Sequence, residues 1–327
     1  MKKRKRILSG IQPSGTIHIG NYFGAIENWV RLMDDYDCFF TIVDLHAITV
    51  SYDPKALPQR VWDAALDNIA AGLDPKKCTI FIQSHVPEHT ELCWLLNCVT
   101  PLGELGRMTQ FKEKSERERE NVTAGLLNYP ILQAADILIY KADAVPVGED
   151  QAQHLEFSRE VARRFNGRFG DYFPEPATLI GRGARIMGID GAAKMSKSLD
   201  NVIGVTEEPD AIWEKLRPAK TDEARKRRTD PGEPDRCNIY SYHKLVTPEA
   251  ELAEIAKGCR DASIGCLDCK RIFHRNLMKV LDPIRERRKA LAQDPEAVRE
   301  ALRQGAERAR AVARETLDGA KKLMGLL

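Results

Sequence analysis

Two lysines and two serines near the middle of the chain form the pattern best suited to hold a polyphosphate. Residues 188–200 read GIDGAAKMSKSLD, so Lys194 and Lys197 alternate with Met195, Ser196 and Ser198. We call this segment the lysine loop; its glycines, alanines and few apolar anchors predict mobility. Two cations flanked by hydroxyls on a flexible segment can neutralise phosphate charge that must be held only transiently.

A glycine-rich segment near the amino terminus offers a second place for phosphate. Residues 10–24 read GIQPSGTIHIGNYFG and follow a short apolar run, which predicts a strand, a loop and a helix start. His18, Gly20 and Asn21 fall at that helix start, where unpaired N–H groups and the helix dipole favour phosphate. A tight turn in which His18 and Asn21 only cap the helix fits the same residues.

Alternating strands and helices are expected to position both segments. Apolar runs at residues 6–9, 38–44 and 78–83 indicate buried strands, and helical periodicity lies between them. This alternation predicts an α/β fold with a doubly wound parallel sheet. Asp44 and His46 end the second run, at the edge where such sheets bind ligands.

A third candidate group lies on one predicted helix, residues 125–140. Its spacing places Tyr129, Gln133 and Asp136 on one face of an otherwise apolar segment. A carboxylate in such a setting needs a hydrogen-bond donor, which a ligand N–H or O–H could supply. An internal cap or a buried ion pair would meet the same need.

Composition narrows the class of protein. The chain has 327 residues, of which 43% are hydrophobic and 30% charged, and its net charge is +2. No apolar run approaches a membrane span, and no signal peptide is recognisable, so we expect a cytoplasmic protein without a membrane partner. Basic clusters at 2–6 and 225–228 could meet phosphate or be solvated surface.

The eight cysteines form two groups. Cys38, Cys78, Cys93 and Cys98 lie on apolar segments, and we expect buried thiols. The spacing C-x21-C-x6-C-x2-C, in a polar helical region, suits tetrahedral sulfur ligation of zinc or of an iron–sulfur cluster, although four unligated cysteines would also fit. Its members are Cys237, Cys259, Cys266 and Cys269.

The motifs HIGN at 18–21 and KMSKS at 194–198, about 175 residues apart, together resemble the paired signatures of class I aminoacyl-tRNA synthetases. More closely, GIQPSGTIHIGNYFGAI, TIVDLHAIT, MTQFKEKS and VPVGEDQAQHLEFSRE are similar to segments of the bacterial tryptophanyl-tRNA synthetase family. The resemblance covers nearly the whole chain. It implies a Rossmann-like catalytic domain, and activation of tryptophan by ATP with Mg²⁺ before transfer to tRNA(Trp).

The resemblance also implies residue roles. The lysines would neutralise the leaving pyrophosphate, and Gln12 would meet the reacting carboxylate region. The implied catalytic residues are Lys194, Lys197, Lys114 and Gln12, and the implied ATP-binding residues are Gln12, His18, Gly20, Asn21, Lys194, Met195, Ser196 and Lys197. Asp136 would accept the indole N–H, with Tyr129, Gln133, His46, Val145, Val147 and Gln151 around the tryptophan.

Two departures leave the amino acid open. Leu8 stands where the family often has an aromatic residue, and Gln133 stands where it often has methionine. Tyr129, Gln133 and Asp136 also resemble the phenol-binding trio of tyrosyl-tRNA synthetases, which keeps tyrosine as an alternative. A small-molecule nucleotidyltransferase and a non-catalytic, synthetase-derived tRNA-binding iron–sulfur protein are alternatives of other classes.

The family pattern further implies domains and partners. Residues 1–205 would form the catalytic domain, 206–293 a helical anticodon-binding domain, and 294–327 a helix returning to the catalytic domain. The family's members are homodimers, so we expect one here. A subset of the family binds a [4Fe–4S] cluster through a similar four-cysteine pattern, with one residue more in the first gap, and we expect the cluster rather than Zn²⁺.

Overall fold

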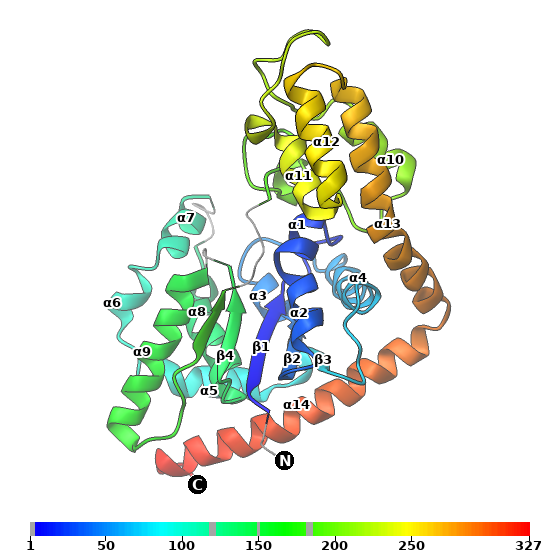
Figure 1. Ribbon diagram of the computed structural model, residues 1–327. Coiled ribbons are helices and arrows are strands. Elements are labelled where there is room, and N and C mark those ends of the chain that lie inside the picture. The colour runs from blue at the N-terminus through cyan, green and yellow to red at the C-terminus, as the bar shows by residue number, and fades with distance from the viewer. Residues whose placement is uncertain (1–3, 118–121, 149–150, 181–185) are drawn as a thin grey trace.

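A parallel sheet lies at the centre of the molecule. The computed structural model describes residues 4–117, 122–148, 151–180 and 186–327 (Figure 1). The strands are β1 (Arg6–Ile11), β2 (Asp37–Ile42), β3 (Thr79–Ile82), β4 (Ala144–Val147) and β5 (Ala177–Ile180). They pair in the order β3-β2-β1-β4-β5, with every pairing parallel, so the expected doubly wound sheet is confirmed. The edge strand β5 was not expected, because its four residues form a pattern too short to stand out in the sequence.

Both faces of the sheet are buried, because successive side chains of each strand point to opposite sides. Ile7, Phe40 and Ile80 belong to the core on one face, and Leu8 and Phe39 to the core on the other. The first face is covered by α1 (Ile19–Asn21), α2 (Glu27–Leu32) and α4 (Leu57–Ala70), and the second by α5 (Glu88–Asn97), α8 (Ala124–Ile139) and α9 (Ala152–Phe169). The short helices α3 (Asp44–Ala47), α6 (Leu102–Leu105) and α7 (Thr109–Arg117) connect these layers.

The last helix, α14 (Pro295–Leu323), crosses the end of the sheet where the strands begin (Figure 1). Gly305 permits this close packing, because a Cβ there would lie 1.8 Å from the carbonyl oxygen of Ile80. Arg308 donates to the carbonyl of Cys78, and Lys321 pairs with Glu91 at 2.7 Å. The chain terminus is thus tied to β3 and α5, far along the sequence.

Four further helices stand over the opposite end of the sheet, above the carboxyl ends of the strands (Figure 1). They are α10 (Pro209–Leu216), α11 (Asn238–Val246), α12 (Glu249–Arg260) and α13 (Cys266–Gln293). Among the described residues, no helix combines the length and apolar character needed to cross a membrane.

Candidate active site

A cavity of about 500 Å³ opens at the carboxyl ends of β1 and β4. The chain leaves these neighbouring strands in different directions, and doubly wound sheets bind ligands at such a point. The cavity brings together all seven residues expected to surround tryptophan, and also Gln12 and Asn21. The seven residues expected to surround the ligand are His46, Tyr129, Gln133, Asp136, Val145, Val147 and Gln151.

Asp136 is a buried carboxylate held by three side chains. Its Oδ2 accepts from His46 Nε2 at 2.8 Å, while its Oδ1 accepts from Gln83 Nε2 at 2.8 Å and from His89 Nδ1 at 2.5 Å. Burial alone would raise the pKa of Asp136, but the bonds from His46 and His89 outweigh burial and lower the pKa to about 2. The carboxylate therefore stays ionised and accepts only.

His89 is itself oriented by Tyr140, which binds the ring nitrogen that does not contact Asp136. Its Nε2 lies 2.7 Å from the hydroxyl of Tyr140, a fully buried residue at the end of α8. With Nδ1–H donating to Asp136, Nε2 is the acceptor and the tyrosine hydroxyl donates to it. His46, in contrast, lines the cavity, so it is the donor that an incoming ligand N–H could displace.

The polar side of the cavity is formed by Tyr129 and three glutamines. The Tyr129 hydroxyl lies 2.9 Å from His154 Nε2 and 3.4 Å from Gln110 Oε1. Gln133 Nε2 donates to Gln151 Oε1 across 3.4 Å, a long bond that a ligand's polar group could replace. These side chains can therefore receive the ammonium and carboxylate groups of an amino acid.

His18 and Asn21 cap α1 and each other. His18 Nδ1 accepts from the Asn21 N–H at 3.3 Å, and Asn21 Oδ1 accepts from the His18 N–H at 3.2 Å. Burial, followed by the charges of Lys197 and Lys194, lowers the pKa of His18 to about 4, so the imidazole is neutral. The structure thus confirms that His18 and Asn21 cap the helix. Phosphate binding at the same helix start stays a prediction.

The glycine-rich segment and the stretch after the lysine loop pair directly through their backbones. Ile19 N donates to Ile203 O at 2.9 Å, and Val205 N donates to Ile17 O at 2.9 Å. At the lysine loop itself, Met195 is buried in the core and its N–H donates to Ile186 O. A Cβ on Gly20 would meet the His18 ring at 2.8 Å and Met195 at 3.5 Å, so glycine is needed where the two segments meet.

The two loop lysines differ in their surroundings. Lys194 is exposed, whereas Lys197 is half-buried against Gly15, where an added Cβ would lie 3.7 Å from its Nζ. Burial lowers the pKa of Lys197 to about 8. Lys114 falls within α7, but its side chain lies outside the described part of the structure.

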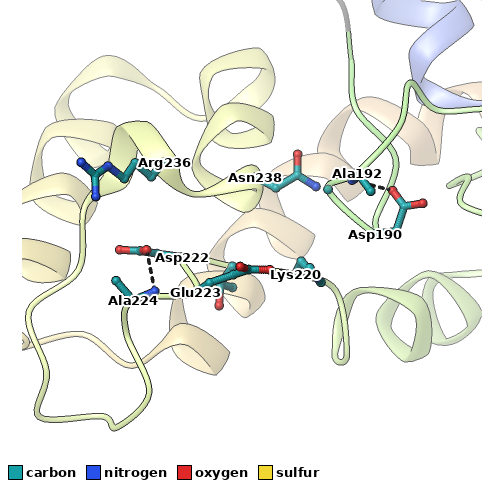
Figure 2. Close-up of a pocket in the computed structure, with 10 residues that line it drawn as sticks. Asp190, Ala192, Lys220, Asp222, Glu223, Ala224, Arg236 and Asn238 are labelled. Atoms are coloured by element: carbon teal, nitrogen blue, oxygen red, sulfur yellow. Dashed lines mark hydrogen bonds and ion pairs between the residues drawn. The ribbon is translucent and has the colours of Figure 1, made fainter.

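A second cavity, of about 480 Å³, lies at the base of the lysine loop (Figure 2). It is lined by Asp190 and Ala192 of the loop and by Lys220, Asp222 and Asn238 of the helical region, among others. Asn238 Nδ2 donates to Gly188 O at 2.7 Å, and Lys220 N donates to Ile189 O at 3.0 Å. The loop is thus anchored to the helices above the sheet.

The four cysteines of the spaced pattern lie near one another. Burial, and then the neighbouring thiols of Cys237, Cys259 and Cys266, raise the pKa of Cys269 to about 12. Arg225 Nη1 lies 3.8 Å from Cys259 Sγ and supplies a nearby positive charge. Within the described ranges, however, no three His, Cys, Asp or Glu side chains are arranged as a site for a metal ion.

The cysteines of the first half only partly follow expectation. Cys38 and Cys78 are buried, Cys93 is half-buried, and Cys98 is exposed. The expectation of a buried thiol is wrong for Cys98, because this residue caps the end of α5 and its side chain faces outward. All eight cysteines are free thiols.

Sequence reasoning missed the residues that hold the cavity's polar groups in place. Gln83 and His89 contact Asp136, and Gln110 and His154 contact Tyr129. Gln83 directly follows β3, so the strand-end rule that selected Asp44 and His46 applies to it as well. His89 and His154 lie inside helices and carry no such signal.

Comparison with known proteins agrees with this arrangement. Residues 1–282 match the family model described as "tRNA synthetases class I (W and Y)". The chain is 54% identical to the tryptophan–tRNA ligase of Deinococcus radiodurans over 98% of this chain and 99% of that protein. It is 42% identical to the corresponding Thermotoga maritima ligase, over 98% and 99% of the two chains.

Solved structures show the same similarity in three dimensions. The crystal structure of Campylobacter jejuni tryptophanyl-tRNA synthetase complexed with ADP and tryptophan aligns with a TM-score of 0.89 at 34% identity. The alignment covers 98% of this chain and 100% of that one. The likeness therefore extends over the sheet, the cavity and the helices above it.

Proposed function

The chain belongs to the bacterial tryptophanyl-tRNA synthetases of class I, and we propose that its two reactions take place in the cavity at the ends of β1 and β4. It is a tryptophan–tRNA ligase, with L-tryptophan, ATP and tRNA(Trp) as its substrates. One observation supports this assignment of the site: Asp136 lines the same cavity as Gln12 and Asn21 of the glycine-rich segment, and that segment packs against Met195 of the lysine loop at Gly20.

Activation needs positioning and charge stabilisation more than a nucleophilic side chain. The tryptophan carboxylate attacks the α-phosphorus of ATP, a P–O bond forms, and the bond to pyrophosphate breaks. We assign Gln12 to the reacting carboxylate, and Lys194, Lys197 and Lys114 to the charge that gathers on pyrophosphate. Mg²⁺, which ligases of this class use with ATP, supplies further charge neutralisation when bound.

The glycine-rich segment would hold the nucleotide. We assign His18, Gly20 and Asn21 to ATP, together with Met195 and Ser196 of the lysine loop. The neutral His18 imidazole adds no positive charge, so we assign the neutralisation of phosphate charge to the lysines. In the second reaction a terminal ribose hydroxyl of tRNA attacks the tryptophanyl carbonyl and AMP leaves, which again requires orientation rather than covalent catalysis.

Tryptophan recognition is assigned to Asp136 and the cavity wall. The indole N–H can only donate and the ionised Asp136 can only accept, so the two match. Val145 and Val147 would contact the ring, while Tyr129, Gln133 and Gln151 would bind the amino acid's polar end. The relative crystallised with ADP and tryptophan is a precedent for both ligands in this fold.

Exchange of pyrophosphate into ATP tests the assignment. Exchange should depend on tryptophan, and an Asp136→Asn variant should need far more tryptophan while Lys197→Met should exchange slowly at saturating tryptophan. If both variants instead kept wild-type exchange, the cavity would not be the reaction site.

We further propose that Cys237, Cys259, Cys266 and Cys269 hold a [4Fe–4S] cluster, with zinc as the alternative. Four nearby thiols with Arg225 beside them suit an anionic sulfur-ligated group. Four thiolates in a tetrahedral arrangement would also bind zinc, so zinc is the alternative on the same four cysteines. The cluster would stabilise the packing of α11, α12 and α13 rather than take part in catalysis.

Metal analysis of anaerobically purified protein separates these cases. Iron and sulfide in equal amounts, lost in a Cys269→Ser variant, support the cluster. Zinc without iron would show a zinc site in place of the cluster. Protein with neither iron nor zinc would show that the four cysteines bind no metal.

We also propose how two copies of the chain associate and how each copy divides into domains. Trp94 of α5 and Leu102 of α6 are 68% and 71% exposed, and we propose that a second copy of the chain covers them. Residues 206–293 would read the anticodon, and 294–327 would stabilise the catalytic domain. Light scattering of a Trp94→Lys/Leu102→Lys variant should report monomers where the parent protein is a dimer. The cytoplasmic location stays a prediction.

A further inference from the structure

A buried carboxylate outside the cavity lies close to both signature segments. Asp67, on α4, is 0% exposed. Its Oδ2 accepts from the backbone N–H of Ile17 at 3.4 Å, and its Oδ1 accepts from Arg288 Nε at 2.5 Å. Burial raises the pKa of Asp67, and the hydrogen bonds from Arg288 and from the Ile17 N–H offset part of that effect.

Arg288 reaches Asp67 from the far end of the chain. It lies near the end of α13, and its Nη2 also pairs with Asp63 Oδ1 at 2.9 Å. The preceding residue, Arg287, donates to the carbonyl of Ala70 at 2.6 Å, so the end of α13 is fixed along α4. The same helix begins at Cys266, within the four-cysteine group.

Asp67 also acts on Lys197 of the lysine loop. Burial lowers the pKa of Lys197, and the negative charge of Asp67 raises it. The positive charge of Arg60, on the same helix as Asp67, lowers it further. The Lys197 ammonium lies against Gly15, two residues before the Ile17 N–H that Asp67 binds.

In the part of the chain that the structure describes, the charges that shift the pKa of Lys197 come from α4. Asp67 raises this pKa and Arg60 lowers it, and the charge of Lys197 in turn lowers the pKa of His18 in the glycine-rich segment. Arg288 and Asp63 act through Asp67, because both belong to the same ion-paired group. Among the described residues, Asp67 is the anion that acts directly on Lys197, and Arg288 partly neutralises its charge.

We propose that the buried Asp67–Arg288 pair is a positioning device for Lys197, in which Asp67 attracts the Lys197 ammonium toward the glycine-rich segment and Arg288 limits that attraction. The proposal rests on the assignment of Lys197 to the polyphosphate of ATP. Before ATP binds, Asp67 is the counter-charge of the half-buried ammonium; polyphosphate then replaces it. Asp67 touches no substrate and is not a catalytic residue.

Competition labelling of the full-length protein with acetic anhydride tests this directly. Only the neutral amine reacts, so the pH dependence of acetylation at Lys197, read by mass spectrometry, reports its charge without requiring activity. Lys194, exposed on the same loop, is the internal reference. Labelling with and without ATP reports separately whether the nucleotide covers Lys197.

Opposite shifts are expected from the two halves of the pair. Asp67→Asn removes the attracting charge and should move the Lys197 titration down by roughly half a pH unit or more. Arg288→Gln should move it up by a similar amount, because Asp67 then acts without its counter-charge. Arg60→Gln, at an exposed position on the same helix, should also move it up while leaving the Asp67–Arg288 pair in place.

The outcomes distinguish the positioning role of the Asp67–Arg288 pair from the assignment of Lys197 to the polyphosphate of ATP. Shifts of Asp67→Asn and Arg288→Gln in the same direction, or no shift in either, overturn the positioning role. If Asp67→Asn does not fold, an unchanged titration in Arg288→Gln beside an upward shift in Arg60→Gln overturns it equally. Lack of protection by ATP would instead remove Lys197 from the polyphosphate site, whatever the shifts are.

Discussion

The amide of Asn238 donates a hydrogen bond of 2.7 Å to the carbonyl oxygen of Gly188, joining the first turn of α11 to the entrance of the lysine loop. Tyr242, one turn later, donates to the adjacent carbonyl of Met187 at 2.6 Å, and Lys220 N binds the carbonyl of Ile189. Three consecutive carbonyls, at residues 187–189 where the lysine loop begins, are thus bound by the helical region. The start of the lysine loop is therefore held by the helical region that stands over the sheet, where Asn238 and Asp190 line one cavity (Figure 2).

Replacing Asn238 should slow activation without changing tryptophan binding. Asn238→Ala leaves the buried Gly188 carbonyl without this donor, at a cost of about 1 kcal/mol, or about fivefold in rate if the cost falls on the transition state. We expect a several-fold lower kcat for pyrophosphate exchange and an unchanged KM for tryptophan. Ser241→Ala is the matched control, because Ser241 is exposed and its hydroxyl donates to the Asn238 carbonyl on the same helix. Equal effects of the two variants would contradict the anchoring role.

Replacing Asp136 should remove selectivity for the indole N–H. A hydrogen bond to a charged group contributes about 1.5–3 kcal/mol, so Asp136→Asn should lower kcat/KM for tryptophan by roughly 10- to 150-fold. The preference for tryptophan over an analogue with sulfur in place of the N–H should fall with it. Loss of activity with the preference intact would show that Asp136 is needed only for folding, and thermal melting identifies that case.

Gln133 is expected to have little influence on the choice between indole and phenol. Its amide binds Gln151 rather than Asp136, so a phenol hydroxyl would find no preformed pair there. Gln133→Met should therefore keep tryptophan as the amino acid that drives exchange, although loss of a hydrogen bond to its charged polar end should lower kcat/KM by about tenfold. Neither protein should show exchange driven by tyrosine. Tyrosine-driven exchange in the parent protein that Gln133→Met abolishes would reverse this conclusion.

His18 should make the protein less stable in mild acid. Its pKa is about 4 in the folded state against an ordinary value of 6.5, because burial disfavours the charged form. Between these values the unfolded chain binds a proton that the folded chain does not, so stability falls as pH falls from 6.5 to 4. The loss at pH 5 amounts to about 2 kcal/mol. Urea unfolding of the parent and of His18→Gln at pH 7 and pH 5 measures it: the parent should lose more stability than the variant, and parallel losses would refute the assignment.

The sequence by itself determined the chemistry and the class of fold. Strand and helix periodicity is a local property, so it predicted the parallel sheet and placed Asp136 and Tyr129 on one helix face. The two signature segments carry their glycines, lysines and capping residues within a few positions, so the prediction of phosphate binding also rests on a local pattern. The same holds for the cysteine spacing.

Only the tertiary structure decided which groups control these residues. The backbone bonds between Ile19 and Ile203, the donation of Gln83 and His89 to Asp136, and the pairing of Asp67 with Arg288 join positions tens to hundreds of residues apart. No spacing rule relates such positions, because their meeting is fixed by how helices pack on the sheet. Burial then sets the charges of His18 and Lys197, and burial exists only once the chain is folded.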